Sequence, residues 1–440
     1  MNRWKLLMEE EPTDESAGPA VLVSALKWAA GLSDSNRLLV GCGIILLAAL
    51  SLLPFLNEMP NGDVLHYNEV ANDLLVGKLP YRDRVFEYPP YAVPIFLLPR
   101  LFGDDDYTMR FMAFGMLADW FLRFQLLKLG MKSEKRKRWL LPLLLYSAGI
   151  PFIQRFYLQR FDIWPALLCV LVVSWFCSRR YALAGLVVAV GACTKVYPLL
   201  FVPALLAIAR RQNCAGRLAT GMCVGFAPVL FMGVYLPWWR FAEFQGARGL
   251  QVESLYASIL WFGSRLGVVH LQWIWNRAWF EISGPSASFL LPWARGLFVA
   301  AVGGSVAVGT WFASQCENLT AGRLARLLLL PLLAFVGFNT VLSPQFMIWL
   351  APLAAVASLD GNKLSVALIG VATMLTPVFY PCRDYNIGLS LFETSALLLR
   401  NLMLVAVWGL LLREMWFSSR GLAPEANRSQ RMASLLNISK

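Results

Sequence analysis

Apolar segments long enough to cross a lipid bilayer recur along almost the whole chain, from Arg37 to Arg413. A helix needs about 20 predominantly apolar residues to cross the hydrocarbon core. Of the 440 residues, 58% are hydrophobic and only 15% are charged, which is too apolar for a chain whose whole surface faces water. The pattern therefore predicts an all-α polytopic membrane protein that has membrane lipids as partners.

The predicted spans number about twelve, as judged from the length of the apolar segments. They cover residues 38–56, 107–127, 139–154, 162–178, 181–195, 196–209, 217–237, 289–313, 324–342, 343–358, 364–380 and 394–413. The spans that flank Lys195 and Ser343 are short or closely abutted, so we expect broken or re-entrant helices there. The Pro-punctuated stretch 89–103 is expected to dip into the membrane, or lie on it, without crossing.

The orientation follows from the basic residues. The net charge of +12 arises mainly from Lys and Arg in short loops between apolar segments, and the largest group lies between Lys128 and Arg138. Because cytoplasmic loops carry an excess of these residues, we expect the basic loops and both termini to lie inside. The basic residues form no patch interleaved with aromatic side chains, so no nucleic-acid partner is expected.

This orientation divides the chain into three parts. Residues 1–36 form a cytoplasmic segment, residues 37–413 a transmembrane domain, and residues 414–440 a cytoplasmic tail. Two long polar loops, 58–106 and 238–288, are then extracytoplasmic, and the first of them is acidic. A basic n-region followed by a cleavage site is absent from the N-terminal segment, so the first span is expected to serve as the targeting signal.

Polar side chains from distant segments come to the outer membrane face on this topology. They are Asp63, Arg82, Arg160, Lys195, Arg248, Glu253 and Gln345. A carboxylate in an outer loop is usually a solvated charge, which is our interpretation of Asp73 and Asp105. Asp63 differs because it follows the first span closely, where the membrane boundary can hold it against an amphipathic substrate. Arg160 has two interpretations that stay open, a functional one and simple pairing with Asp162.

Other polar residues are interpreted as structural. Asp119 and Arg123 are spaced i,i+4 in a predicted span, so they are expected to neutralise each other. His66 and His270 lie in separate outer loops, and two ligands do not make a catalytic zinc site. The eight cysteines include no CxxC pair. We therefore expect no metal, disulfide framework or other cofactor.

Several motifs recur in a fixed order along the chain. The first outer loop contributes Asp63, Tyr67, Gly77, Leu79-Pro80-Tyr81, Asp83, Phe86 and Tyr88-Pro89-Pro90. Later motifs are Lys195-Val196-Tyr197-Pro198, residues 248–254 and residues 339–350, the last with Ser343-Pro344-Gln345-Phe346. In order and spacing together, these motifs resemble glycosyltransferase family 87 over residues 38–358. This family is a branch of the GT-C membrane glycosyltransferases that includes polyprenol-phosphate-mannose-dependent mannosyltransferases. Thr340 stands where the family often has Lys.

The resemblance implies a GT-C-type fold with its active site on the extracytoplasmic side of the cell membrane. It implies an inverting transfer of a sugar, mannose in the best-known relatives, from a polyprenyl-phosphate donor to a lipid or glycan acceptor. By analogy Asp63 is the general base. Guanidinium and ammonium groups suit phosphate oxygens, so the expected phosphate-binding residues are Arg82, Lys195, Arg248 and Arg160. The other expected substrate-binding residues are Tyr67, Tyr88, Glu253 and Gln345.

Two alternatives stay open at this point. A transporter or lipid flippase would also have many spans, but its hallmarks are internal repeats and a site at the middle of the membrane. We find no convincing repeat, and a transporter would leave the acidic loop after the first span unexplained. A polysaccharide polymerase or ligase also acts on lipid-linked sugars at the outer face. Such proteins usually carry their large loop late in the chain, whereas here the acidic loop comes first.

Overall fold

The computed structural model describes residues 31–50, 52, 62–103, 105–133, 138–276, 279–316, 318–361, 363–379 and 389–419. Most of the predicted N-terminal segment lies outside the described residues, as do the tail beyond residue 419 and the start of the first polar loop. Three members of the predicted basic cluster, Lys135, Arg136 and Lys137, also lie outside them.

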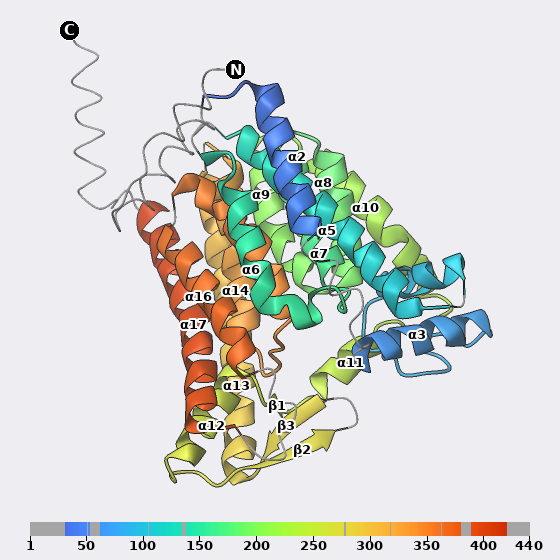
Figure 1. Cartoon of the computed structure of the whole chain (residues 1–440), viewed down its shortest axis with the longest axis vertical. Helices are drawn as coiled ribbons and strands as arrows, with labels where there is room; N and C mark the ends of the chain where they lie inside the picture. The colour runs from blue at the N-terminus through green and yellow to red at the C-terminus, as the bar shows by residue number, and fades with distance from the viewer. Residues whose placement is uncertain are drawn as a thin grey trace, which may run out of the picture.

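The described chain forms a bundle of apolar helices (Figure 1). The bundle consists of α2 (Asp34–Leu50), α5 (Tyr107–Met131), α6 (Leu141–Tyr157), α7 (Ile163–Cys177), α8 (Tyr181–Thr194), α9 (Val202–Arg211), α10 (Ala215–Met232), α13 (Pro285–Gln315), α14 (Ala321–Gly337), α15 (Phe346–Ala357), α16 (Lys363–Phe379) and α17 (Leu391–Ser419). Each of these helices overlaps one predicted span. By length and composition, three helices in the described part of the chain can cross a membrane, namely α10, α13 and residues 391–417 of α17.

The core of the bundle is built on helices that are apolar on every side. In α7 the residues after Trp164 run Pro-Ala-Leu-Leu-Cys-Val-Leu-Val-Val, and most of them are buried. A helix that is apolar on every side is usually buried, and here neighbouring helices cover α7. Residues of α14 and α15 pack into the same hydrophobic core as α7.

One polar network is buried inside this core, between α5 and α6. Asp119 and Arg123 are 0% and 1% exposed, and Arg123 Nε donates to Asp119 Oδ2 at 2.7 Å. The hydroxyls of Tyr146 and Tyr157 both donate to Asp119 Oδ1, the former at 2.9 Å. The predicted i,i+4 pair is confirmed. The two tyrosines complete the hydrogen bonding that a buried ion pair requires, and Tyr157 ends α6 just before the segment 158–162.

The predicted breaks near Lys195 and Ser343 are confirmed. α8 ends at Thr194, Lys195 is extended with φ −152° and ψ 132°, and a 3-10 helix η5 (Tyr197–Phe201) leads into α9. Pro198 lies in the first turn of η5, where its missing N–H costs no hydrogen bond. α14 ends at Gly337 and α15 begins at Phe346, so Ser343 lies in the non-helical segment between them.

α8 and α10 approach each other closely through glycines. A Cβ atom on Gly221 of α10 would overlap the carbonyl oxygen of Ala182, and one on Gly185 of α8 would overlap that of Leu218. Small residues at a helix interface allow backbones to come together in this way. The two helices therefore pack backbone against backbone.

The polar loops carry shorter elements. The first loop contains α3 (Gly62–Leu75), α4 (Ala92–Leu97) and the 3-10 helix η3 (Leu98–Phe102). Together α4 and η3 span only residues 92–102, which is too short to cross a bilayer. Another short 3-10 helix, η6 (Ser358–Asp360), follows α15.

The second polar loop adds a small sheet that the sequence analysis did not predict. It contains α11 (Arg240–Gly246), β1 (Leu250–Gln251), α12 (Leu255–Arg265), β2 (Gln272–Asn276) and β3 (Trp279–Ser283). The strands pair antiparallel in the order β1-β3-β2, with Ile282 opposite both Leu250 and Trp273. In Figure 1, α3, α11 and the sheet lie in the lower part of the view, whereas α2 begins and α17 ends at the top.

Candidate functional site

Asp63 is the second residue of α3 and forms an ion pair with Arg160. Arg160 belongs to the segment 158–162, which connects α6 to α7. The side chain of Asp63 is 31% exposed and that of Arg160 is 12% exposed. The guanidinium of Arg160 thus pairs with the proposed catalytic carboxylate, and a functional role of Arg160 stays a prediction.

Asp162 binds a different cation, Lys195 at the end of α8. Asp162 is completely buried, and its Oδ1 accepts hydrogen bonds from Lys195 Nζ and Trp349 Nε1, each at 2.7 Å. The Lys195 ammonium also lies 4.3 Å from the ring centroid of Phe161, 5.1 Å from that of Trp349 and 5.3 Å from that of Tyr88. Aromatic faces attract a cation. Lys195 is therefore held by one carboxylate and three rings.

An aromatic cluster joins α3 to this site. Tyr67 is fully buried and stacks on Phe96 of α4, with their ring centroids 4.2 Å apart. It also meets Phe161 edge-on at 5.7 Å and Tyr88 at 6.2 Å. Burial raises the pKa of Tyr67 well above its ordinary value, the charge of Asp63 raises it further, and Arg160 acts in the opposite direction. The Tyr67 hydroxyl therefore keeps its proton at physiological pH.

The second polar loop contacts the first near Arg248. Gln245 of α11 donates from Nε2 to the carbonyl of Glu87 at 3.1 Å and accepts from Arg248 Nη1 at 3.3 Å. Burial lowers the pKa of Arg248, and the carboxylates of Glu87 and Glu281 counteract that effect. These interactions place Arg248 beside the first loop, as expected for a residue of the same site.

Arg82 lies on an exposed turn of the first loop. Its side chain is 57% exposed, and it donates to Asp83 through Nε at 3.0 Å and through Nη2 at 2.9 Å. The hydrogen bond from Arg82, together with one from the backbone of Leu79, lowers the pKa of Asp83. Arg82 is thus engaged at the surface by its own neighbour, whereas Arg160 and Lys195 are held inside the cluster.

Glu253 and Gln345 lie in contacts with helices of the bundle. Glu253 is 5% exposed, and its carbonyl accepts hydrogen bonds from Arg400 Nη2 at 3.2 Å and Asn401 Nδ2 at 3.1 Å. Gln345 immediately precedes α15, and its Oε1 accepts from the hydroxyl of Ser343 at 2.5 Å. Sequence reasoning missed Arg400 and Asn401, although an adjacent polar pair inside the apolar α17 is a visible signal.

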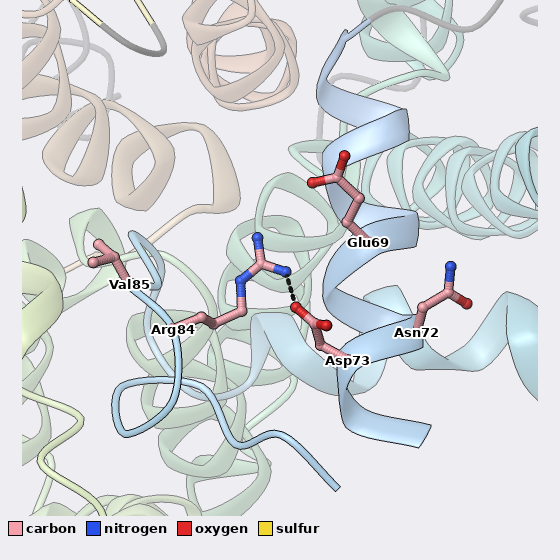
Figure 2. A pocket seen from close by; sticks show the side chains of 5 residues that line it. All are labelled: Glu69, Asn72, Asp73, Arg84 and Val85. Carbon is pink, nitrogen blue, oxygen red and sulfur yellow. Dashed lines mark hydrogen bonds and ion pairs between the residues drawn. The ribbon is translucent and has the colours of Figure 1, made fainter. Parts of the chain in front are cut away.

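A polar depression of about 540 Å³ lies beside α3 (Figure 2). It is lined by Glu69, Asn72, Asp73, Arg84 and Val85. Neither Asp63 nor Arg160 lines this depression, so it is distinct from the Asp63–Arg160 pair. Asp73, interpreted as a solvated charge, is partly exposed, and its carboxylate binds Arg84 at 2.6 Å and Lys78 at 3.3 Å.

A carboxylate and two cations in one cluster suit a reaction in which a group passes from one oxygen atom to another. Asp63 is exposed enough to accept a proton, and Arg160 and Lys195 carry donors that fit an anionic leaving group. In the described part of the chain, no group of three or more His, Cys, Asp or Glu side chains is arranged to hold a metal ion.

Comparison with known proteins decides the family. The sequence model of glycosyltransferase family 87 matches residues 86–344, more than half of the chain. The chain belongs to glycosyltransferase family 87. A search of solved structures finds similarity between this family 87 protein and the crystal structure of ArnT from Cupriavidus metallidurans bound to undecaprenyl phosphate. The two share 13% sequence identity over 87% of this chain and 78% of that one, with a TM-score of 0.49. A search of curated proteins finds no match.

Membership of family 87 confirms the predicted resemblance and the membrane GT-C class that includes this family. The protein is a membrane glycosyltransferase, which decides against a transporter or flippase. The match does not reach every expected site residue. It includes Tyr88, Arg160, Lys195, Arg248 and Glu253, while Asp63, Tyr67, Arg82 and Gln345 lie outside it.

Asp162 and Trp349 were not predicted as residues of the candidate site of this family 87 enzyme. Asp162 directly precedes the apolar segment of α7. A carboxylate next to a span is the same signal that singled out Asp63. Trp349 offered no such signal, because an indole in the apolar α15 looks like an ordinary core residue.

Proposed function

We propose that this family 87 enzyme transfers a sugar from a polyprenyl-phosphate donor to a lipid or glycan acceptor at the extracytoplasmic membrane face, with inversion at the anomeric carbon. Mannose is the proposed sugar. The observation that carries this proposal is the pairing of Asp63 with Arg160 beside the Asp162–Lys195 pair. Asp63 of α3, Arg160 of the segment 158–162 and Lys195 at the end of α8 thus contribute a carboxylate and two cations to one site.

In the proposed reaction, the acceptor hydroxyl attacks the anomeric carbon while Asp63 takes its proton. The bond between that carbon and the phosphate oxygen breaks, and its electron pair leaves with the phosphate. Arg160 and Lys195 stabilise the negative charge of the leaving phosphate, with Arg248 as a further cation beside the first loop. Attack on the face opposite the leaving group inverts the anomeric configuration.

Arg160 has a double role in this proposal. Its guanidinium pairs with Asp63, which neutralises the carboxylate in a partly buried place. The phosphate of the donor can accept two hydrogen bonds from the same guanidinium group, one through each of two oxygens. When Arg160 turns to that phosphate, Asp63 is released for the acceptor hydroxyl.

The arrangement of the elements supports an outer location for the site. The part of Figure 1 that holds α3, α11 and the sheet lies away from the start of α2 and the end of α17. We propose that residues 37–413 form the membrane domain, with loops 58–106 and 238–288 outside and residues 1–36 and 414–440 inside, as the positive-inside rule requires. A donor anchored in the membrane then meets the enzyme at the interface.

Membranes that contain the enzyme test the proposal when they are incubated with labelled polyprenyl-phosphate sugars and, separately, with labelled nucleotide sugars. We expect label from the polyprenyl-phosphate donor in a lipid or glycan product, with or without EDTA. Equal transfer from a nucleotide sugar would contradict the proposed donor. Loss of activity with EDTA that a divalent ion restores would contradict the metal-free mechanism. Transfer of a whole preformed glycan would favour a polymerase or ligase.

A further inference from the structure

Two polar atoms in the aromatic cluster are buried and have no hydrogen-bond partner among the residues that the structure describes. They are the hydroxyl oxygen of Tyr67 and Oδ2 of Asp162. Both side chains belong to residues that are 0% exposed. Buried polar groups are nearly always hydrogen-bonded in folded proteins, so two such atoms in one site require an explanation.

The two groups lie in the same part of the site. Phe161 immediately precedes Asp162, and its ring meets the Tyr67 ring edge-on at 5.7 Å. Tyr67 follows Asp63 by one turn on the inner face of α3. Among the charged groups that act on the Tyr67 hydroxyl are Asp63, Arg160 and Asp162. Both atoms are therefore neighbours of the proposed catalytic pair.

The missing partners are of opposite kinds. The Tyr67 hydroxyl is protonated, so it has a hydrogen to donate. The Oδ2 atom of Asp162 can only accept. Asp162 cannot turn this oxygen elsewhere, because Lys195 and Trp349 both donate to its Oδ1 and hold the carboxylate in place. A group that accepts one hydrogen bond and donates another satisfies both atoms, and a hydroxyl is the simplest such group.

We propose that Tyr67 and Asp162 form a subsite for one hydroxyl of the donor sugar, and that this subsite selects which sugar is transferred. The inference rests on the proposed function. A sugar whose reacting carbon lies at Asp63 brings its ring hydroxyls into this cluster. A sugar that lacks the matching hydroxyl leaves two buried groups unsatisfied, and sites built to bind a hydroxyl reject such analogues strongly.

The test uses the full-length enzyme in membranes and a set of polyprenyl-phosphate donors, each lacking one sugar hydroxyl. With the wild type, we expect one deoxy donor to lose about tenfold or more in kcat/KM. Tyr67→Phe should lose a similar factor with the complete sugar but little more with that deoxy donor, because the same hydrogen bond is already missing. Such non-additivity identifies a direct interaction.

A second variant tests the other half of the subsite. Asp162→Asn keeps an oxygen for Lys195 and Trp349 but places a donating amide where Oδ2 accepts. It should show the same coupling to the same deoxy donor as Tyr67→Phe. The matched control is Tyr107→Phe, since the Tyr107 hydroxyl already donates to the carbonyl of Phe96 at 2.9 Å. We expect this control to leave the ratio between complete and deoxy donors unchanged.

The possible outcomes separate the two proposals. If Tyr67→Phe and Asp162→Asn lower kcat/KM by one common factor for every donor, the subsite is refuted and both residues are structural. If the wild type transfers the complete sugar but rejects none of the deoxy donors, the subsite is again refuted while the proposed function stands. If the wild type transfers no sugar from any polyprenyl-phosphate donor, both proposals fail together.

Discussion

Two carboxylates of the candidate site, Asp63 and Asp162, have surroundings that suit them to different tasks. Asp63 is 31% exposed and is paired with Arg160. Asp162 is 0% exposed and is bonded to both Lys195 and Trp349. Separating a buried ion pair typically costs about 3–5 kcal/mol, so Asp162 is poorly placed to leave its partners and take a proton. We therefore propose the more exposed Asp63, and not Asp162, as the general base.

Replacing this base tests its role directly. Asp63→Asn keeps the size of the side chain and removes the proton acceptor. General-base assistance is typically worth about 10² to 10⁴ in rate, so we expect kcat to fall by roughly that factor while donor binding persists. Turnover is measured at equal amounts of folded protein.

Asp73→Asn is the matched control, because Asp73 lies on the same helix and its carboxylate binds Arg84 and Lys78. We expect its turnover to stay near that of the wild type. Near-normal turnover of Asp63→Asn would require another base, with Asp83 or Glu87 next in the first loop and Glu253 in the second.

At the residue scale, the sequence predicts which polar side chains are candidates for a site better than it predicts which side chains are in contact. Asp63 and Lys195 stand out because each adjoins an apolar segment. The pairing of Arg160 with Asp63 on α3 depends on how the first loop folds over the bundle. The aromatic contacts of Tyr67, Phe96 and Phe161 set that fold, and none of them is local in sequence.

At the element scale, the sequence predicts the helices well. Each helix is indicated by its own apolar stretch, so its prediction does not depend on contacts with the rest of the chain. The break after α8 is equally local, since Pro198 prevents a continuous helix. The sheet in the second polar loop is different. Its strands have only two, five and five residues, too few for alternation to stand out in a loop rich in aromatic side chains.

The contact between α8 and α10 gives a prediction at this scale. Gly221→Ala places a methyl group against the carbonyl oxygen of Ala182. Overpacking typically costs about 1–3 kcal/mol, so we expect a lower unfolding temperature of the detergent-purified protein. Gly216→Ala on the same helix is the control, because a Cβ there has nothing within 4 Å. If Gly221→Ala unfolds at the wild-type temperature, the two backbones do not touch as described.

At the scale of the whole molecule, the proposed function requires that the first polar loop lies outside. Asn72 on α3 and Lys132 after α5 are both exposed, so a cysteine at either position is accessible to a reagent. In a chain whose eight native cysteines have been replaced, a membrane-impermeant thiol reagent added to intact cells should label Asn72→Cys. Lys132→Cys should be labelled only after the membrane is opened. The reverse pattern would place the proposed active site on the cytoplasmic side.

The buried pair in α5 also bears on how the protein is made. An isolated charge at the centre of a membrane helix costs roughly 2.5–3.5 kcal/mol on insertion scales. Asp119 and Arg123 lie one turn apart on the same helix, so α5 carries both the charge and its counter-charge when it leaves the ribosome. In the predicted span formed by α5, Arg123 therefore neutralises Asp119 before α6, which carries Tyr146 and Tyr157, packs against it in the membrane. An aspartate in α5 that was neutralised by a cation from α6 would stay unpaired until α6 had packed against α5.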